Sequence, residues 1–150
     1  MTDTINKMQN LASEIVKSNQ ALREYAQEHG RAAIGAAFKE LLDRHPSVAR
    51  VSWTQYTPYF NDGDVCRFSV HGLCVVPADN PDDDEDYEFE IYRSAHYNST
   101  PAGLTPEAAD EFLALWGKIN NNDLMLATFG DHSRVVITRE GLEVESYDHD

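Results

Sequence analysis

The stretch "VARVSWTQYT", residues 48–57, marks the point where the spacing of apolar side chains changes from a helical period to a period of two. Its valines, threonines and aromatic residues favour extended backbone. The chain before it has a helical pattern, and most of the chain after it has short alternating runs. Helices followed by consecutive strands predict an α+β fold with a mostly antiparallel sheet, rather than repeated βαβ units.

Two helices are predicted before this strand. The first runs from Thr2 to about His29 and ends at Gly30, because no proline interrupts it and glycine commonly ends helices. The second helix covers residues 31–44 and ends before Pro46, and its apolar face is expected to cover a sheet.

The first helix carries a stripe of apolar or small residues in alternating three- and four-residue steps, as in a coiled coil. The series is Ile5, Met8, Ala12, Ile15, Asn19, Leu22 and Ala26. Leu11, Val16 and Tyr25 widen the stripe and few charges flank it, so bundle packing competes with a true coiled coil. Such a stripe needs a partner, either the protein's own sheet or a second chain. We therefore expect residues 1–30 to form a long helix that can mediate homo-oligomerisation.

Further strands and one helix are predicted after residue 57. Residues 65–76 and 87–93 alternate like the first strand, with Gly72 as the place where a bulge would reset the alternation. "LTPEAADEFLALWGKI", 104–119, predicts a helix with Thr105 as N-cap and Pro106 at the first helical position. "LMLATF", 124–129, predicts a short strand, followed by a turn and a C-terminal hairpin. We expect about five strands in one domain covering residues 1–150.

The charge excludes several classes of partner. The 150 residues include 26 acidic and 12 basic side chains, so the formal net charge is -14. Such a chain repels phosphate backbones and anionic lipids, so direct nucleic-acid or membrane binding is not expected. Neither a transmembrane run nor a secretion signal is seen, which indicates a cytoplasmic protein. The spacing of Cys66 and Cys74 fits no zinc or redox motif, so buried thiols are expected.

The segment "WTQYTPYFNDGD", residues 53–64, is the main candidate site, and two interpretations compete for it. Its Asn-Asp-Gly sequence is typical of a hairpin turn, over which the aromatic side chains would simply pack. Alternatively, the aromatic residues form a stacking wall with polar groups at its rim, as in a ligand or partner site. The candidate residues are Trp53, Tyr56, Tyr59, Asn61, Asp62 and Asp64.

Two other features of the sequence are candidate sites. Asp82, Asp83, Asp84 and Glu85 belong to a strongly acidic segment that predicts an electrostatic patch, while no motif specifies a metal or any other cofactor. Asp131 beside His132 resembles a general base with its orienting group, but no nucleophile motif accompanies the pair. A turn-forming aspartate next to an exposed histidine is the simpler interpretation.

"WTQYTPYFNDGD", the following "CRFSVH" and the C-terminal "FGDHSRVVITREGLEVESYDHD" resemble a small-protein family of T-even-like tailed phages. The resemblance covers roughly residues 38–150 and implies an accessory protein acting in the cytoplasm of the infected bacterium. We expect a non-enzymatic protein that modulates a host process, such as defence, by binding a host protein or sequestering a small ligand. The alternatives are a metal-assisted or acid-base hydrolase of a nucleotide-like substrate, using Asp62, Asp64 and His132, and an acidic nucleic-acid mimic.

Overall fold

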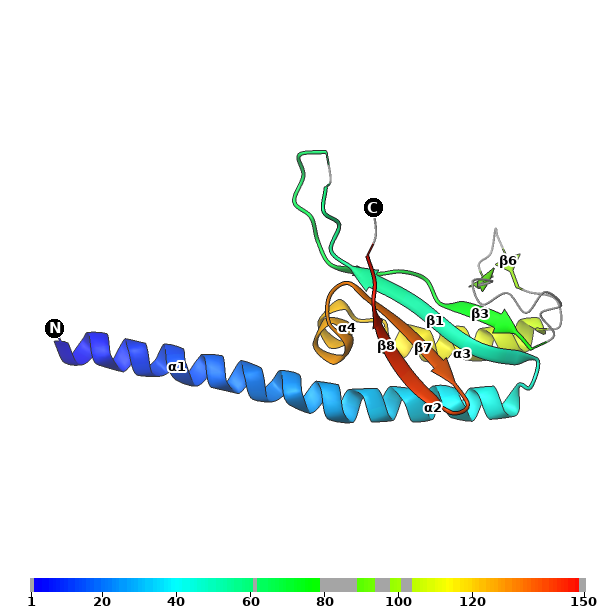
Figure 1. Ribbon diagram of the computed structural model, residues 1–150, viewed down its shortest axis with the longest axis horizontal. Helices are drawn as coiled ribbons and strands as arrows, with labels where there is room; N and C mark the ends of the chain where they lie inside the picture. Colours follow the sequence, from blue (N-terminus) through cyan, green and yellow to red (C-terminus); the bar gives the residue numbers. More distant parts are fainter. Residues whose placement is uncertain (1, 61, 79–88, 94–97, 101–103, 149–150) are drawn as a thin grey trace.

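The structure is a computed structural model that describes residues 2–60, 62–78, 89–93, 98–100 and 104–148. A long N-terminal helix leads into a head built from a sheet and further helices (Figure 1). The sheet is antiparallel at every pairing among the described strands. The predicted α+β class is therefore confirmed.

The two predicted N-terminal helices form one unbroken rod (Figure 1). Helix α1 (Thr2–Tyr25) continues through a π-helical turn, η1 (Ala26–Gly30), into α2 (Arg31–Arg44). The prediction that Gly30 ends a helix is wrong, since its φ of -65° and ψ of -46° are helical. The glycine is instead needed for close packing, because a Cβ there would lie 2.9 Å from Oγ1 of Thr128. None of the described helices is both long and apolar enough to cross a membrane.

The sheet is centred on β1 (Val48–Tyr56), which covers the strand predicted at residues 48–57 except its last residue. Its strand order is β4-β3-β1-β7-β8, and β2 also pairs with β1. The other members of this sheet are β2 (Ser69–Val70), β3 (Cys74–Pro77), β4 (Phe89–Glu90), β7 (Ser133–Thr138) and β8 (Gly141–Ser146). A separate pair joins β5 (Tyr92–Arg93) to β6 (Asn98–Ser99).

The predicted strand over residues 65–76 is interrupted. It provides β2 and β3, which both pair with β1, and Val70 faces Gln55 while Cys74 faces Ser52. Four steps on one strand thus match three on the other, which is the extra residue that a bulge introduces. Gly72 lies in this interval, where a Cβ would collide with the side chain of Glu90. Both cysteines are free thiols and only partly buried, so the expectation of buried thiols is wrong.

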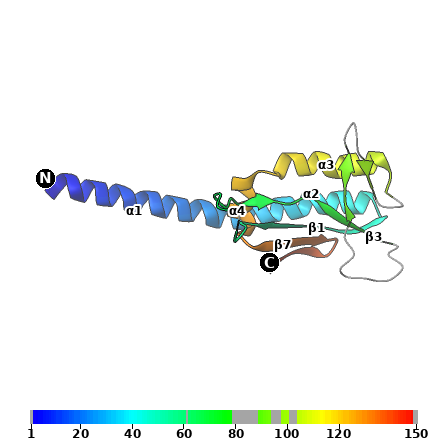
Figure 2. The ribbon, with the colours of Figure 1, turned by 90° about the horizontal axis from the view of Figure 1, so that it is seen from above.

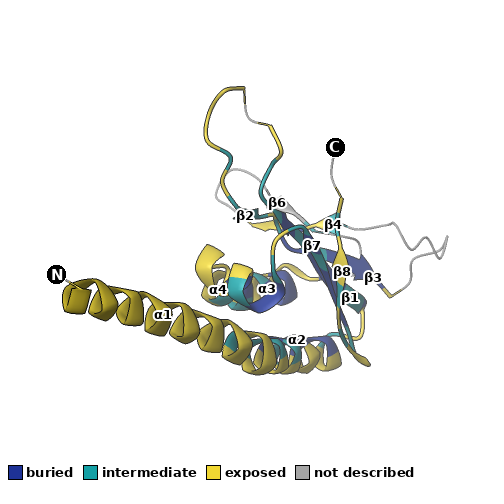
Figure 3. Ribbon diagram, turned by 60° about the vertical axis from the view of Figure 1, so that its left-hand side comes forward, coloured by how far each residue is buried: buried dark blue, intermediate teal, exposed yellow. Residues whose placement is uncertain are grey.

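The hydrophobic core lies between the sheet and the helices α2, α3 (Pro106–Ile119) and α4 (Asn122–Phe129) (Figures 2 and 3). Trp53 is at its centre with only 2% of its surface exposed. Its ring contacts those of Phe38, Trp116 and Phe129 at centroid distances of 6.0, 5.0 and 5.5 Å. Trp53 therefore cannot belong to an exposed stacking wall, and that part of the site prediction is wrong.

Residues 124–129 lie in a helix, not in the predicted short strand. Helix α4 (Asn122–Phe129) begins where the Asn121 side chain accepts a hydrogen bond from the amide of Leu124, at 3.0 Å. It ends at Gly130, whose φ of 86° suits glycine. Its buried residues, Met125, Thr128 and Phe129, recur at helical spacing. The apolar run "LMLATF" was too short to separate the two periods, and the asparagine cap decides the outcome.

Candidate functional site

The connection between β1 and β2, of which residues 57–60 and 62–68 are described, projects from the head as a hairpin that we call the finger (Figure 1). Large apolar side chains are exposed on it: Tyr59 at 66%, Phe60 at 77% and Val65 at 73%. Asp62 and Gly63 both have positive φ angles, 46° and 87°, which turn the chain at the far end. The turn chemistry that the sequence indicated is thus present, and the aromatic residues beside it do not all pack into the head.

A hollow of about 550 Å³ lies within the finger. It is lined by Pro58, Phe60, Asp64, Val65 and Arg67, so it combines apolar side chains with one acidic and one basic group. All five residues belong to the finger itself. A group that fills this hollow would therefore contact the segments on both sides of the turn at once.

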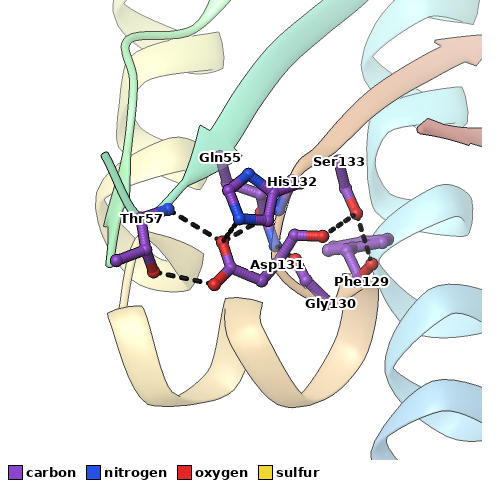
Figure 4. A network of polar contacts seen from close by, with 7 residues as sticks. All are labelled: Gln55, Thr57, Phe129, Gly130, Asp131, His132 and Ser133. Carbon is purple, nitrogen blue, oxygen red and sulfur yellow. Dashed lines mark hydrogen bonds and ion pairs between the residues drawn. The ribbon is translucent and has the colours of Figure 1, made fainter. Parts of the chain in front are cut away.

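The base of the finger is anchored to the turn between α4 and β7 through Asp131 (Figure 4). The Asp131 carboxylate accepts hydrogen bonds from the Thr57 amide at 2.8 Å and from the Thr57 hydroxyl at 2.7 Å. It also accepts one from the amide of His132 at 2.9 Å. Partial burial raises the pKa of Asp131, but these hydrogen bonds and the nearby His132 ring outweigh it and hold the pKa below its ordinary value. The anchor is therefore formed by the charged carboxylate.

The His132 side chain contacts the finger at its base. Its ring stacks on Tyr59 with centroids 5.0 Å apart and planes inclined by 14°. Its backbone has a φ of 51°, which few residues other than glycine adopt and which belongs to the tight turn. Nε2 of His132 lies 3.7 Å from Oδ1 of Asp131, too far for a hydrogen bond. Asp131 thus acts here as a turn-forming anchor for Thr57.

A second aromatic group lies where the finger leaves the sheet. Tyr56 stacks on His71 with ring centroids 4.5 Å apart, and the centroid of the Tyr147 ring lies 5.7 Å from that of Tyr56. The amide of Tyr147 donates to the carbonyl of His132 at 2.8 Å, which ties the C-terminal segment to the same turn. Tyr56 is half-buried, so it supports the root of the finger and is less available than Tyr59.

Gln55 holds the anchoring turn in place from inside the head (Figure 4). Its fully buried Nε2 donates to the carbonyls of Met125 at 2.9 Å and Gly130 at 2.7 Å, and its Oε1 accepts from Nε1 of Trp53 at 3.1 Å. Because these groups are buried, leaving any of them unsatisfied would destabilise the fold. The sequence analysis missed Gln55, although a polar residue on the same strand face as Trp53 was an available signal.

The predicted site residues thus lie in different parts of the molecule. Tyr59, Asp62 and Asp64 are exposed on the finger, Tyr56 lies at its root and Trp53 lies in the core. The remaining predicted residues, Asn61, Asp82, Asp83, Asp84 and Glu85, lie outside the described residues. The sequence analysis did not select Phe60 and Val65, the two most exposed apolar side chains of the finger. Phe60 directly follows Tyr59, so its position next to the turn was a usable signal.

Within the described part of the chain, no three His, Cys, Asp or Glu side chains gather closely enough to hold a metal ion. Asp62 and Asp64 are exposed on the finger, and His132 is engaged with Tyr59 at its base. This arrangement offers no observation in favour of the hydrolase alternative. Comparison with known protein families, curated proteins and solved structures found no match to this chain.

Proposed function

We propose that this chain is a non-enzymatic phage accessory protein that uses its finger to bind a host protein in the bacterial cytoplasm and thereby modulates a host process. The observation that carries this proposal is the exposure of Tyr59, Phe60 and Val65 together on one projecting hairpin. Exposed apolar groups collected in one place are characteristic of interaction surfaces. Aromatic side chains of this kind commonly contribute most of the binding energy at protein interfaces.

The shape of the finger favours a protein partner over a small ligand. Sites for small molecules are usually concave and enclose most of the ligand surface. The hollow of the finger is lined from one hairpin alone, and its apolar residues Phe60 and Val65 remain more than two-thirds exposed. A partner with a groove would cover these side chains, whereas a small ligand in the hollow would leave much of them in water.

The anchor at Asp131 supports the same function. Binding by a loop costs free energy when the loop must first be ordered. The two hydrogen bonds from Thr57 to Asp131 and the stacking of Tyr59 on His132 hold the base of the finger before any partner arrives. The finger is therefore prepared for binding, and the chain's net charge of -14 would accelerate its association with a basic partner at low salt.

The test is an affinity capture from bacterial host lysate, quantified by mass spectrometry. The combined change Tyr59→Ala and Phe60→Ala should reduce the specific partner at least about tenfold, because two exposed aromatic anchors are lost. Tyr92→Ala is the matched control, since Tyr92 is an exposed tyrosine on β5, outside the finger. Near-UV circular dichroism should show an intact head in all variants. Equal capture by the double variant and the wild-type protein would refute the proposal.

A further inference from the structure

Helix α1, which we call the arm, carries a row of apolar side chains that the head does not cover. None of its 24 residues is buried (Figure 3). Two views at right angles show that most of the arm extends away from the head (Figures 1 and 2). Ile5, Met8, Leu11, Ile15 and Leu22 are between 52% and 68% exposed. The alternative in which the protein's own sheet covers this stripe is therefore contradicted.

A helix whose apolar face does not pack against its own chain needs stabilisation from another source. Isolated helices of modest length are only marginally stable in water, and most helical stability in proteins comes from packing an apolar face. The arm contains several residues with weak helix propensity, and it receives no tertiary packing along its first turns. A packing partner along the apolar row would supply what the head does not.

The spacing of the row specifies a coiled-coil seam. When Ile5 is assigned to heptad position a, Ala12 and Asn19 follow at a, and Met8, Ile15 and Leu22 occupy d. A single asparagine at an a position is the known device that selects two strands in parallel and in register, because the two amides can then pair across the axis. In an antiparallel pair, a residues pack against d residues, so Asn19 would face an apolar side chain.

The flanking positions agree with this arrangement. In a parallel pair, a residue at g lies near the residue five positions later, at e, of the other chain. Leu11 at g therefore lies near Val16 at e of the second copy, and the reciprocal pair forms on the other side. This pairing gives both of these exposed side chains an apolar neighbour. The pairing brings no two like charges together across the seam, since Arg23 is the only charged residue at an e or g position of the arm.

The charge of the arm favours a second copy of this chain as the partner. Residues 2–25 contain three acidic side chains, Asp3, Glu14 and Glu24, and three basic ones, Lys7, Lys17 and Arg23, so the arm is formally neutral. The whole chain has a net charge of -14, all of which comes from residues outside the arm. Two copies repel one another over the rest of their surfaces, and the neutral arm is where they can approach.

The side of the rod that meets the head is different from the side that carries the row. Where α1 passes into α2, Gly30 packs on Thr128, and the side chain of Arg31 donates to the carbonyl of Thr128 at 2.9 Å. Arg23 and Gln27 line a hollow shared with α4. Leu22, only one residue from Arg23, is still 65% exposed, so the seam is open up to the junction.

From these observations we propose that two copies of the protein associate through residues 5–22 of the arm as a parallel, in-register coiled coil, with the two Asn19 side chains paired at its centre. This inference does not depend on the function proposed for the finger. It places the two heads at the same end of the dimer.

Stoichiometry is tested first, by sedimentation equilibrium of the full chain across the micromolar range. The wild-type protein should behave as a dimer of the 16.9 kDa chain that dissociates on dilution. Ile15→Asp should shift dissociation to at least about a hundredfold higher concentration, because it places a charge in the seam. Asn10→Asp adds the same charge on the opposite face of the helix and should leave dissociation unchanged. Both variants should keep the near-UV signal of the head, since the arm buries nothing in it.

Orientation is tested by disulfide trapping in a Cys66→Ser, Cys74→Ser background. Leu22→Cys should form a disulfide dimer on mild oxidation, because identical d positions of a parallel pair lie within disulfide distance. In an antiparallel pair, position 22 would instead meet the far end of the partner. Cross-linking only in a mixture of Leu22→Cys and Ile5→Cys proteins would therefore overturn the parallel arrangement. A monomer at every concentration, or a larger assembly, would overturn the two-stranded coil.

Discussion

The two halves of the N-terminal rod have the same backbone conformation and very different surroundings. Helix α1 buries no residue, whereas α2 buries Ile34, Phe38, Leu41 and Leu42 against the sheet and α3. Both halves carry apolar side chains at helical spacing. The pattern alone therefore indicates only that each apolar face will pack against something. The structure shows that the face of α2 packs within the same chain and that the face of α1 does not.

The largest difference between the two halves is expected when the same substitution, Leu→Ala, is made in each of them. Leu42→Ala removes a side chain with 0% exposure and should cost about 2–5 kcal/mol of head stability, as is usual for a cavity in a packed core. Leu11→Ala, at 62% exposure, should change head stability by less than about 0.5 kcal/mol at a concentration where the chain is monomeric. Urea denaturation followed by tryptophan fluorescence measures both. A similar loss for Leu11→Ala would mean that the arm contributes to the head after all.

A smaller effect is expected at the junction of the halves. Gly30→Ala places a Cβ 2.9 Å from Oγ1 of Thr128, a short and fully buried side chain that cannot move away easily. The resulting overpacking exceeds the gain in helix propensity, and we expect a net loss of about 1–2 kcal/mol. Gly117→Ala is the matched control, because nothing lies within 4 Å of its added Cβ in α3. That variant should be as stable as wild type or slightly more stable. Stabilisation by Gly30→Ala in the same denaturation experiment would contradict close packing at the junction.

The smallest effect is expected at the base of the finger, where the stability contributed by Asp131 depends on pH. Because the folded pKa of Asp131 is lowered, its contribution to stability is complete at neutral pH and is lost as the pH falls through the ordinary carboxyl range. The side chain is 37% exposed, so after screening we expect Asp131→Asn to cost no more than about 1 kcal/mol near neutral pH. The difference between wild type and variant should vanish in acid. A difference that grows on acidification would show that the charged carboxylate is not the stabilising form.

Much of the fold was predictable because it depends on local pattern and on turn chemistry. The period change at Val48, the helix cap at Thr105 and the hairpin turn at Gly63 each depend on residues close in sequence. One error arose where a distant residue decides, and the other where a nearby helix cap was overlooked. Gly30 is helical because Thr128 packs on it, and the run at 124–129 is helical because Asn121 caps it and its buried residues face the core.

The candidate site was predictable only in part, for the same reason. Trp53 and Tyr59 were both predicted to belong to an aromatic wall, but β1 ends at Tyr56, so Trp53 lies on the core face of the strand and Tyr59 lies beyond it on the finger. The position of Phe60 next to the turn was a local signal, but its 77% exposure depends on how the finger projects from the head. The interaction of Asp131 with Thr57 spans 74 positions of sequence, and only the packing of the β7 turn against the end of β1 brings the two together.

The unbroken rod gives the proposed dimer a particular advantage, which is avidity. If the arms pair in parallel, the two heads share one end of a coil about 27 Å long, and both fingers are presented on one particle. Once one finger is bound to a target with repeated sites, the second binds within the same complex, at a high effective concentration set by the stiff connection. Even a weak contact of Tyr59 and Phe60 would then give a long-lived complex with a symmetric or multimeric target.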